Sequence, residues 1–153
     1  MRQFDLRSLR FDERNEAWRR LPVEVDPFVI GGLDYAVEDG TVELDLTVAR
    51  VGGRLTLTGS LEAILIGPCQ RCLEEARLPV QARATEVVLH GRSEGVEDEE
   101  AYVAGNTLAL DRWVRDMIAS ALPDKLLCRD ECRGLCPVCG VDLNRAAPDH
   151  SHA

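Results

Sequence analysis

The chain has 153 residues, of which 45% are hydrophobic, 29% charged and only 5% aromatic, and its formal net charge at pH 7 is −9. This composition is typical of one globular domain with a mainly aliphatic core, with room for a small metal-binding appendage, and it excludes a disordered chain. The negative charge argues against wholesale binding to nucleic acid or anionic membranes, and no apolar run approaches the length of a transmembrane helix.

The N-terminal segment carries charges of both signs around a few apolar residues. Because a signal peptide would have an apolar core here, we expect a cytoplasmic, reducing location. Phe4, Leu6 and Leu9 indicate a short strand or extended segment, and residues 12–20 are expected to form one or two helical turns before Pro22. We interpret the arginine excess of this segment as a solvated face rather than a surface for RNA or an acidic partner.

A period-two alternation of apolar and polar residues begins at Tyr35 and predicts a series of antiparallel strands. Asp39–Gly40 stands between two alternating segments and predicts a hairpin turn. Gly52–Gly53 predicts the next reversal of the chain. We therefore expect successive strands to form a β-meander.

The strand that follows, residues 55–65, keeps its apolar side chains on one face. Gly59 interrupts this strand, and a bulge or bend is expected there. A return strand over residues 78–88 has its own apolar face. Cys69 and Cys72 are therefore expected at the tip of an antiparallel hairpin, which would be a fixed platform for a metal knuckle.

An acidic run follows the strands. Residues 94–100 contain five carboxylates and no compensating base. Because they lack the ligand pattern of a calcium loop, we expect a mobile acidic loop rather than a cation site. His90, at the end of the preceding strand, is expected to be structural or solvated.

Apolar residues recur at helical spacing from Leu110 to Leu122 and predict the clearest helix in the chain. Asp111 is a suitable N-cap, and Pro123 marks the end of the helix. An apolar stripe of this kind packs on a sheet. The helix leads directly into the cysteine-rich segment that begins at Cys128, so its packing determines where that segment lies.

Six cysteines and two histidines have the chemistry of metal ligands. In a reducing compartment, cysteines in these spacings favour a metal site over a disulfide framework. Thiolates with some imidazole suit zinc, so we expect one or two zinc ions. The candidate ligands are Cys69, Cys72, Cys128, Cys132, Cys136, Cys139, His150 and His152.

The spacing leaves the grouping of these ligands open. The simplest division gives two sites, one from the pairs at 69/72 and 128/132 and one from the pairs at 136/139 and 150/152. A single zinc held by the two C-x2-C pairs also fits, as does a site built from the four cysteines of segment 128–139. The two histidines could equally be frayed tail residues. Ferredoxin spacings and a general-base motif are absent from the sequence, which favours a structural site.

Several motifs follow one another along nearly the whole chain. They are FDLRSL near the N-terminus, an L-x-G strand ending in Cys69-Gln-Arg-Cys72-Leu73, Ala121-Leu122-Pro123, Leu127-Cys128, Cys132-Arg-Gly-Leu-Cys136-Pro-Val-Cys139-Gly140 and Leu143-Asn144. In this succession the chain resembles the YceD family, the large-ribosomal-RNA-subunit accumulation proteins. The resemblance implies a bacterial or plastid cytosolic-type protein that supports accumulation of large-subunit ribosomal RNA without enzymatic activity. Family members often end in a Cys-x-Cys pair, and His150-Ser151-His152 stands in that place here.

We therefore predict an α+β fold. Residues 1–123 are expected to form an antiparallel β-meander, partly barrel-like, packed by one main amphipathic helix. Residues 124–153 are expected to form a C-terminal zinc-knuckle segment that docks on the hairpin tip at 69–72. The sequence leaves the oligomeric state open.

The predicted function is that of a non-catalytic zinc-binding factor for 23S ribosomal RNA accumulation and ribosome assembly. It would bind a ribosomal protein or precursor RNA, and neither a membrane nor a small-molecule substrate. Arg71, Arg129 and Arg133 are candidate contacts for that partner. The alternative is a thiol or zinc redox sensor, because Arg71 next to the first cysteine pair would lower a thiol pKa. A hydrolytic enzyme with an open zinc position is the least favoured interpretation.

Overall fold

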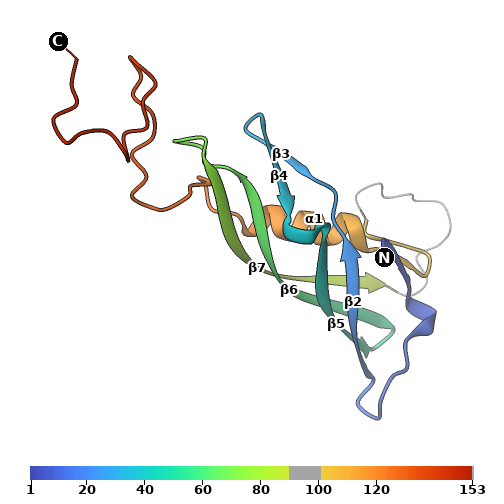
Figure 1. The fold of residues 1–153 in the computed structure, drawn as a ribbon. Coiled ribbons are helices and arrows are strands. Elements are labelled where there is room, and N and C mark those ends of the chain that lie inside the picture. The colour runs from blue at the N-terminus through green and yellow to red at the C-terminus, as the bar shows by residue number, and fades with distance from the viewer. Residues whose placement is uncertain (90–100, 153) are drawn as a thin grey trace.

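The computed structural model, shown in Figure 1, describes residues 1–89 and 101–152. The acidic run 94–100 and His90 lie outside the described residues. The strands are β1 (Gln3–Asp5), β2 (Glu16–Glu24), β3 (Phe28–Ile30), β4 (Leu33–Val37), β5 (Thr41–Val51), β6 (Arg54–Pro68), β7 (Glu75–Leu89), β8 (Val103–Ala104) and β9 (Thr107–Ala109). The helices are α1 (Leu110–Ala121) and two short 3-10 turns, η1 (Leu6–Ser8) and η2 (Glu38–Gly40).

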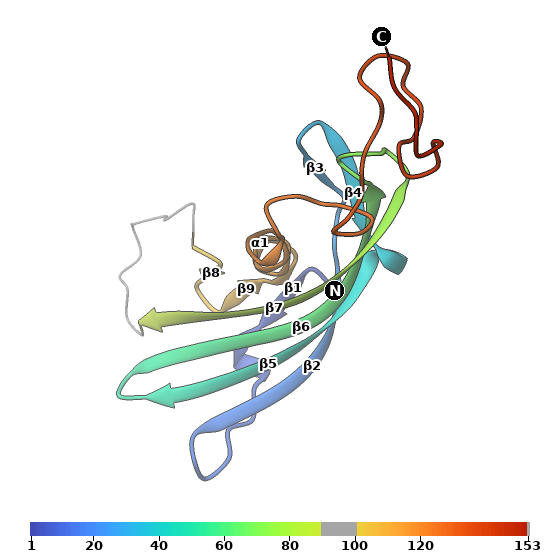
Figure 2. The same cartoon turned by 90° about the vertical axis from the view of Figure 1, so that its left-hand side faces the viewer.

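The main sheet has the strand order β2-β5-β6-β4-β3, with β7 paired to the other side of β6, and its pairings are antiparallel. Figure 2 shows the long strands curving around α1. The predicted mainly antiparallel sheet with one helix is therefore confirmed. The sheet does not close into a barrel, because in the described part of the chain β2 and β7 form no ladder with each other and α1 fills the concave side.

The core lies between α1 and the concave face of the sheet. The apolar stripe of the helix is buried there, and β7 is the strand that α1 contacts most extensively. Alternate residues of β5, such as Leu44, Leu46 and Val48, are completely buried, as the period-two pattern predicts. No helix within residues 1–89 and 101–152 is long and apolar enough to cross a membrane.

Two hairpins of the main sheet, β5–β6 and β6–β7, follow the expected turns. Gly52 and Gly53 have φ values of 53° and 76° and connect β5 to β6, which suits the left-handed backbone of a two-residue hairpin turn. β6 and β7 then pair without interruption from Arg54 opposite Leu89 to Pro68 opposite Glu75. This long hairpin places the first cysteine pair at its tip.

Of the bulge or bend expected at Gly59, the bulge is wrong, because the register of β6 continues through this residue. Gly59 instead lies under the helix, where an added Cβ would stand 2.9 Å from Cη2 of Trp113 and 3.1 Å from Cδ1 of Leu44. The glycine is required because the indole ring packs directly on the backbone of the strand.

The hairpin predicted at Asp39–Gly40 is also wrong. Both residues have positive φ, but β4 and β5 do not pair with each other. Both run antiparallel to β6, β4 opposite Leu65 and Ile66 and β5 opposite residues 54–60. The turn therefore offsets the chain along the side of β6 rather than reversing it.

The helical turns predicted over residues 12–20 are wrong: residues 13 and 14 form a turn, and from Glu16 the chain is in β2, which pairs with β5 along its whole length. Ala17, Leu21 and Val23 alternate toward the core, and this burial outweighs local helix propensity. Pro22 is tolerated because β2 is an edge strand.

The helix begins one residue earlier than the predicted N-cap. Asp111 lies in the first turn of α1, and Ala109 occupies the N-cap position without a side-chain hydrogen bond. The carbonyl oxygen of Arg2 accepts from the N–H groups of Leu110 and Asp111 at 2.9 and 3.2 Å. The N-terminal segment therefore satisfies helix donors that a capping side chain would otherwise bond.

Candidate metal centres

The first cysteine pair lies in a tight turn between β6 and β7. Cys69 follows the last residue of β6, its N–H donates to the carbonyl of Glu74 at 2.8 Å, and its carbonyl accepts from the N–H of Leu73 at 2.9 Å. Leu73 adopts a positive φ of 63°, an unusual conformation for this residue. The backbone N–H of Arg71 points at Cys69 Sγ at 3.5 Å. The thiols of Cys69 and Cys72 lie within 4.8 Å of each other at the hairpin tip.

The segment after α1 returns to this tip, as Figures 1 and 2 show. Leu126 is buried, and Gln70 bonds its backbone twice: Gln70 N–H donates to Leu126 O at 2.8 Å, and Leu126 N–H donates to Gln70 Oε1 at 2.9 Å. The guanidinium of Arg71 donates to the carbonyl of Cys132 at 3.0 Å. These contacts hold Cys128 and Cys132 opposite the first pair.

The four thiols form a compact cluster, called here the first centre: Cys69, Cys72, Cys128 and Cys132. All four Sγ atoms lie within 4.8 Å of one another. Cys69 Sγ is 3.7 Å from Cys132 Sγ, and Cys72 Sγ is 3.8 Å from Cys128 Sγ. Four sulfurs about 2.3 Å from a tetrahedral zinc ion would be about 3.8 Å apart. The cysteines are free, and the donor set fits zinc.

A second cluster, called here the second centre, contains Cys136, Cys139, His150 and His152. Cys136 Sγ is 3.3 Å from His152 Nε2, and Cys139 Sγ is 3.7 Å from His150 Nε2. In a tetrahedral zinc site of two sulfurs and two nitrogens, a sulfur and a nitrogen ligand would lie about 3.6 Å apart. This centre is less buried than the first, since Cys139 and His152 are exposed.

The sequence had left three groupings open, and this arrangement corresponds to the division into two sites. The two C-x2-C pairs do not share one cluster, nor do the four cysteines of segment 128–139. The reason is that the hairpin tip takes the first two thiols of that segment. A metal bound by all four groups of either centre would keep no position for water, which is the arrangement of a structural site.

The thiols of the first centre differ in pKa, and hydrogen bonds to sulfur are one cause of the difference. Burial raises the pKa of Cys69, but backbone N–H groups, with that of Cys72 foremost, outweigh burial and bring its pKa to about 6. Burial and the neighbouring thiol of Cys132 raise the pKa of Cys128 to about 12. The side chain of Asn144 lowers the pKa of Cys132. Some thiols of the metal-free cluster therefore keep their protons at neutral pH. Metal binding would release these protons.

In the second centre, the imidazole of His150 and then the backbone N–H groups of Cys139 and Val138 bring the pKa of Cys136 to about 5. The knuckle backbone supports this arrangement. The N–H of Gly140 donates to the carbonyl of Cys136 at 2.8 Å, and Gly140 has a φ of 75° that suits glycine.

The three arginines proposed as partner contacts lie close to the first centre in the chain. Arg71 is engaged with the Cys132 carbonyl, and Arg129 lies 3.7 Å from Glu131 in an exposed ion pair. Arg133 is exposed, and its side chain has no hydrogen bond or ion pair within the described residues. Their role as contacts stays a prediction.

Two residues that support the first centre received no role from the sequence. Gln70 binds the returning segment, and Asn144 Nδ2 donates to Cys132 Sγ at 3.4 Å. Both are amide side chains inside or beside cysteine motifs. An amide residue beside a cysteine motif is the sequence signal that could have identified them, because an amide near a thiolate can donate a hydrogen bond to it.

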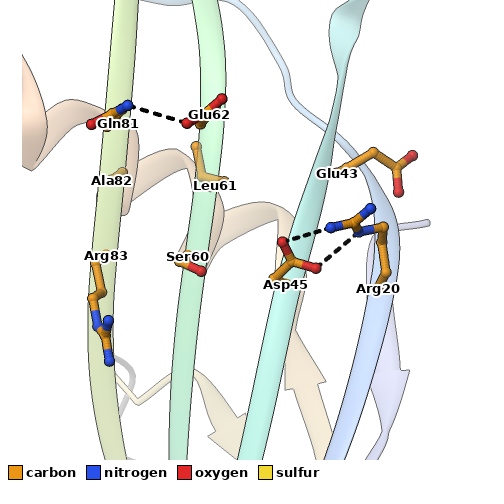
Figure 3. A pocket seen from close by; sticks show the side chains of 9 residues that line it. All are labelled: Arg20, Glu43, Asp45, Ser60, Leu61, Glu62, Gln81, Ala82 and Arg83. Atoms are coloured by element: carbon orange, nitrogen blue, oxygen red, sulfur yellow. Dashed lines mark hydrogen bonds and ion pairs between the residues drawn. The ribbon is translucent and has the colours of Figure 1, made fainter.

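A separate hollow of about 660 Å³ lies on the sheet face away from α1, as Figure 3 shows. Arg20 and Asp45 form an ion pair there at 2.9 Å, and Gln81 donates to Glu62 at 3.1 Å. Ser60 has no histidine or other base paired with it among the lining residues.

Together, the fold and the two clusters define a small curved-sheet protein whose C-terminal segment is organised around candidate metal centres. The model of the family described as large ribosomal RNA subunit accumulation protein YceD matches residues 57–153, which include all eight candidate ligands. The chain belongs to this family, which confirms the resemblance.

The chain is also similar to mycobacterial proteins. It is 36% identical over 131 residues to uncharacterized proteins of Mycobacterium bovis and Mycobacterium tuberculosis, covering 82% of this chain and 63% of theirs. An uncharacterized protein of Mycobacterium leprae is 30% identical over 127 residues, covering 79% and 58%. The chain thus spans less than two thirds of the length of these relatives. No solved structure matches it.

Proposed function

We propose that the protein is a non-catalytic zinc-binding factor of the cytoplasm that supports 23S ribosomal RNA accumulation and ribosome assembly. The observation that carries this proposal is the first centre. Thiols more than fifty residues apart in the sequence, such as Cys69 and Cys132, meet at 3.7 Å. They do so within the segment that matches a family described by large-subunit ribosomal RNA accumulation.

Zinc would act here as a structural ion. After α1, the described residues form no helix and no strand, only an isolated bridge between Leu135 and Asp142. The buried apolar side chains and thiols among these described residues are those of Leu126, Cys132 and Cys136. A segment with so little apolar burial gains its folding free energy from metal binding, as zinc knuckles do. The two ions would hold the surface of residues 124–152 in one shape.

The partner is proposed to be a ribosomal protein or precursor RNA. The net charge of −9 fits a basic protein better than extended RNA. RNA contact would be local, through Arg71, Arg129 and Arg133 beside the first centre. Two variants test this surface separately. Its fold is tested by Cys69→Ser/Cys72→Ser, and its charge by Arg129→Ala/Arg133→Ala.

The test is complementation in a bacterium from which the gene has been removed. Native protein should restore the ratio of 23S to 16S ribosomal RNA and the profile of free subunits, whereas the double-serine variant should not. Zinc is counted by native mass spectrometry of the same proteins. If loss of the gene leaves ribosomal RNA and subunit profiles unchanged, the proposed function is wrong. Co-purification from the complemented strain then identifies the partner as protein or RNA.

A redox sensor is the second candidate, and the exposure of Cys139 in the second centre favours it. Exposed zinc thiolates are open to oxidation, whereas three of the four thiols of the first centre are buried and shielded. Mild peroxide would then release one zinc reversibly and change partner binding. Retention of both ions under peroxide would exclude this function.

A further inference from the structure

A loop connects the two centres. Residues 141–144 lie between the candidate ligands of the second centre in the sequence, and Asn144 of this loop contacts a sulfur of the first centre. Residues 141–144 fold back on the chain that precedes Cys136. Cys136 N–H donates to Val141 O at 2.8 Å, and Leu143 N–H donates to Gly134 O at 2.9 Å. The loop therefore lies between the second knuckle and the first centre.

Asn144, half-buried in this loop, uses its whole amide. Its Nδ2 donates to Cys132 Sγ at 3.4 Å and to Asp142 Oδ1 at 2.9 Å, and its Oδ1 accepts from the N–H of Arg133 at 2.9 Å. The opposite orientation would place Oδ1 against a thiolate and a carboxylate, both acceptors. The surroundings therefore allow a single orientation, with a donor directed at the sulfur.

We propose that Asn144 couples the two metal centres, so that a metal in one raises the affinity of the other. This inference rests on the proposed zinc binding. A hydrogen bond from Asn144 stabilises the Cys132 thiolate as a ligand, and partners of this kind are worth about 10–100-fold in metal affinity. Because coupling between two binding sites is reciprocal, the order of loading does not alter the factor.

The second centre controls this contact through the chain around it. Cys136 and Cys139 precede the loop 141–144, and His150 and His152 follow it. A metal bound by these four groups closes the chain around the loop and removes conformations in which Asn144 points elsewhere. Without that metal, only the backbone hydrogen bonds hold the loop, and they restrict the position of Asn144 less tightly.

The experiment uses cobalt(II) as the probe on the purified full chain. A four-thiolate cobalt site and a site of two thiolates and two imidazoles absorb differently, so the two centres can be followed separately. Competition with a chromophoric chelator measures the affinity of the first centre in the native protein, Asn144→Ala, His150→Ala/His152→Ala and their combination. Asn144→Ala should lower that affinity about 10–100-fold, and the histidine changes should lower it by a factor no larger than this. The combination should lower it no further, because both changes remove the same contact.

An isosteric variant separates the hydrogen bond from packing. Asn144→Asp keeps the shape but directs an acceptor at Cys132, so it should weaken the first centre at least as much as Asn144→Ala and shift the sulfur-to-cobalt charge-transfer band. Asn106→Ala is the matched control, since it removes the same side chain from the turn between β8 and β9. It should leave both centres unchanged.

Two outcomes overturn the coupling. If the effects of the single changes add, or if the first centre is unaffected by them, cobalt binds at independent sites and only this inference fails. If the native protein binds cobalt at neither centre, the proposed zinc binding fails as well.

Discussion

Gly67 lies next to the end of β6, where the backbone passes against the ring of Tyr35. A Cβ at this position would stand 2.1 Å from Cδ1 and 2.6 Å from Cε1 of the ring, and 2.8 Å from the carbonyl oxygen of Asp34. Tyr35 is only 1% exposed, and its hydroxyl donates to the carbonyl of Pro68 at 2.6 Å. Gly67→Ala must therefore displace either a buried ring or the end of β6, which leads directly into Cys69.

The cost follows from these contacts. Forcing a methyl group into a packed core costs about 1–3 kcal/mol. Moving the ring also weakens the hydrogen bond of Tyr35, a loss of about 0.5–1.5 kcal/mol. The free energy of unfolding should fall by about 2–4 kcal/mol, which for a chain of this size lowers Tm by about 5–15 °C. The shift of β6 should also reduce zinc retention at the first centre.

Urea unfolding followed by tryptophan fluorescence measures this loss. Tyr35→Phe, which removes the hydrogen bond alone, should cost only about 1 kcal/mol. Gly32→Ala is a second control: its Cβ would meet nothing within 4 Å, and only its φ of 77° opposes the change, at about 1–2 kcal/mol. A loss below about 1 kcal/mol for Gly67→Ala, or an equal loss when Tyr35 is already alanine, would refute the steric argument.

Three further predictions concern packing, metal release and acid stability. Trp113→Ala should cost about 3–5 kcal/mol in urea unfolding, since the ring is 1% exposed; Trp18→Ala, at an exposed site, should stay within about 0.5 kcal/mol. Because the pKa of Cys128 is about 12, its proton must leave when zinc binds. Zinc affinity should therefore rise with pH, and a chelator titration showing no dependence between pH 5 and 8 would contradict this. Hydrogen bonds from Arg2 lower the pKa of Asp26, so its contribution to stability is present above the unfolded pKa of about 4 and lost as pH falls through the native pKa. Asp26→Asn should flatten the decline of Tm below pH 4, and an unchanged decline would assign it to other groups.

Local patterns predicted the elements whose neighbours are close in sequence. The β6–β7 hairpin, the Gly52–Gly53 turn and the amphipathic helix ending before Pro123 all follow from periodicity and turn residues. The same patterns failed where partners are distant. Residues 12–20 carry no signal that distinguishes a helical turn from an edge strand until β5 is available to pair with them.

The sequence by itself determined which side chains can bind a metal, and that the first cysteine pair lies at the tip of a hairpin. Only the tertiary structure decided how the eight candidate ligands divide into two clusters. The division depends on Gln70 bonding Leu126 and on Asn144 reaching Cys132, contacts between residues that no periodic pattern connects. Spacing limits the conformations of one turn, but the partner of that turn is chosen by the free energy of burying and hydrogen-bonding segments far apart in the chain.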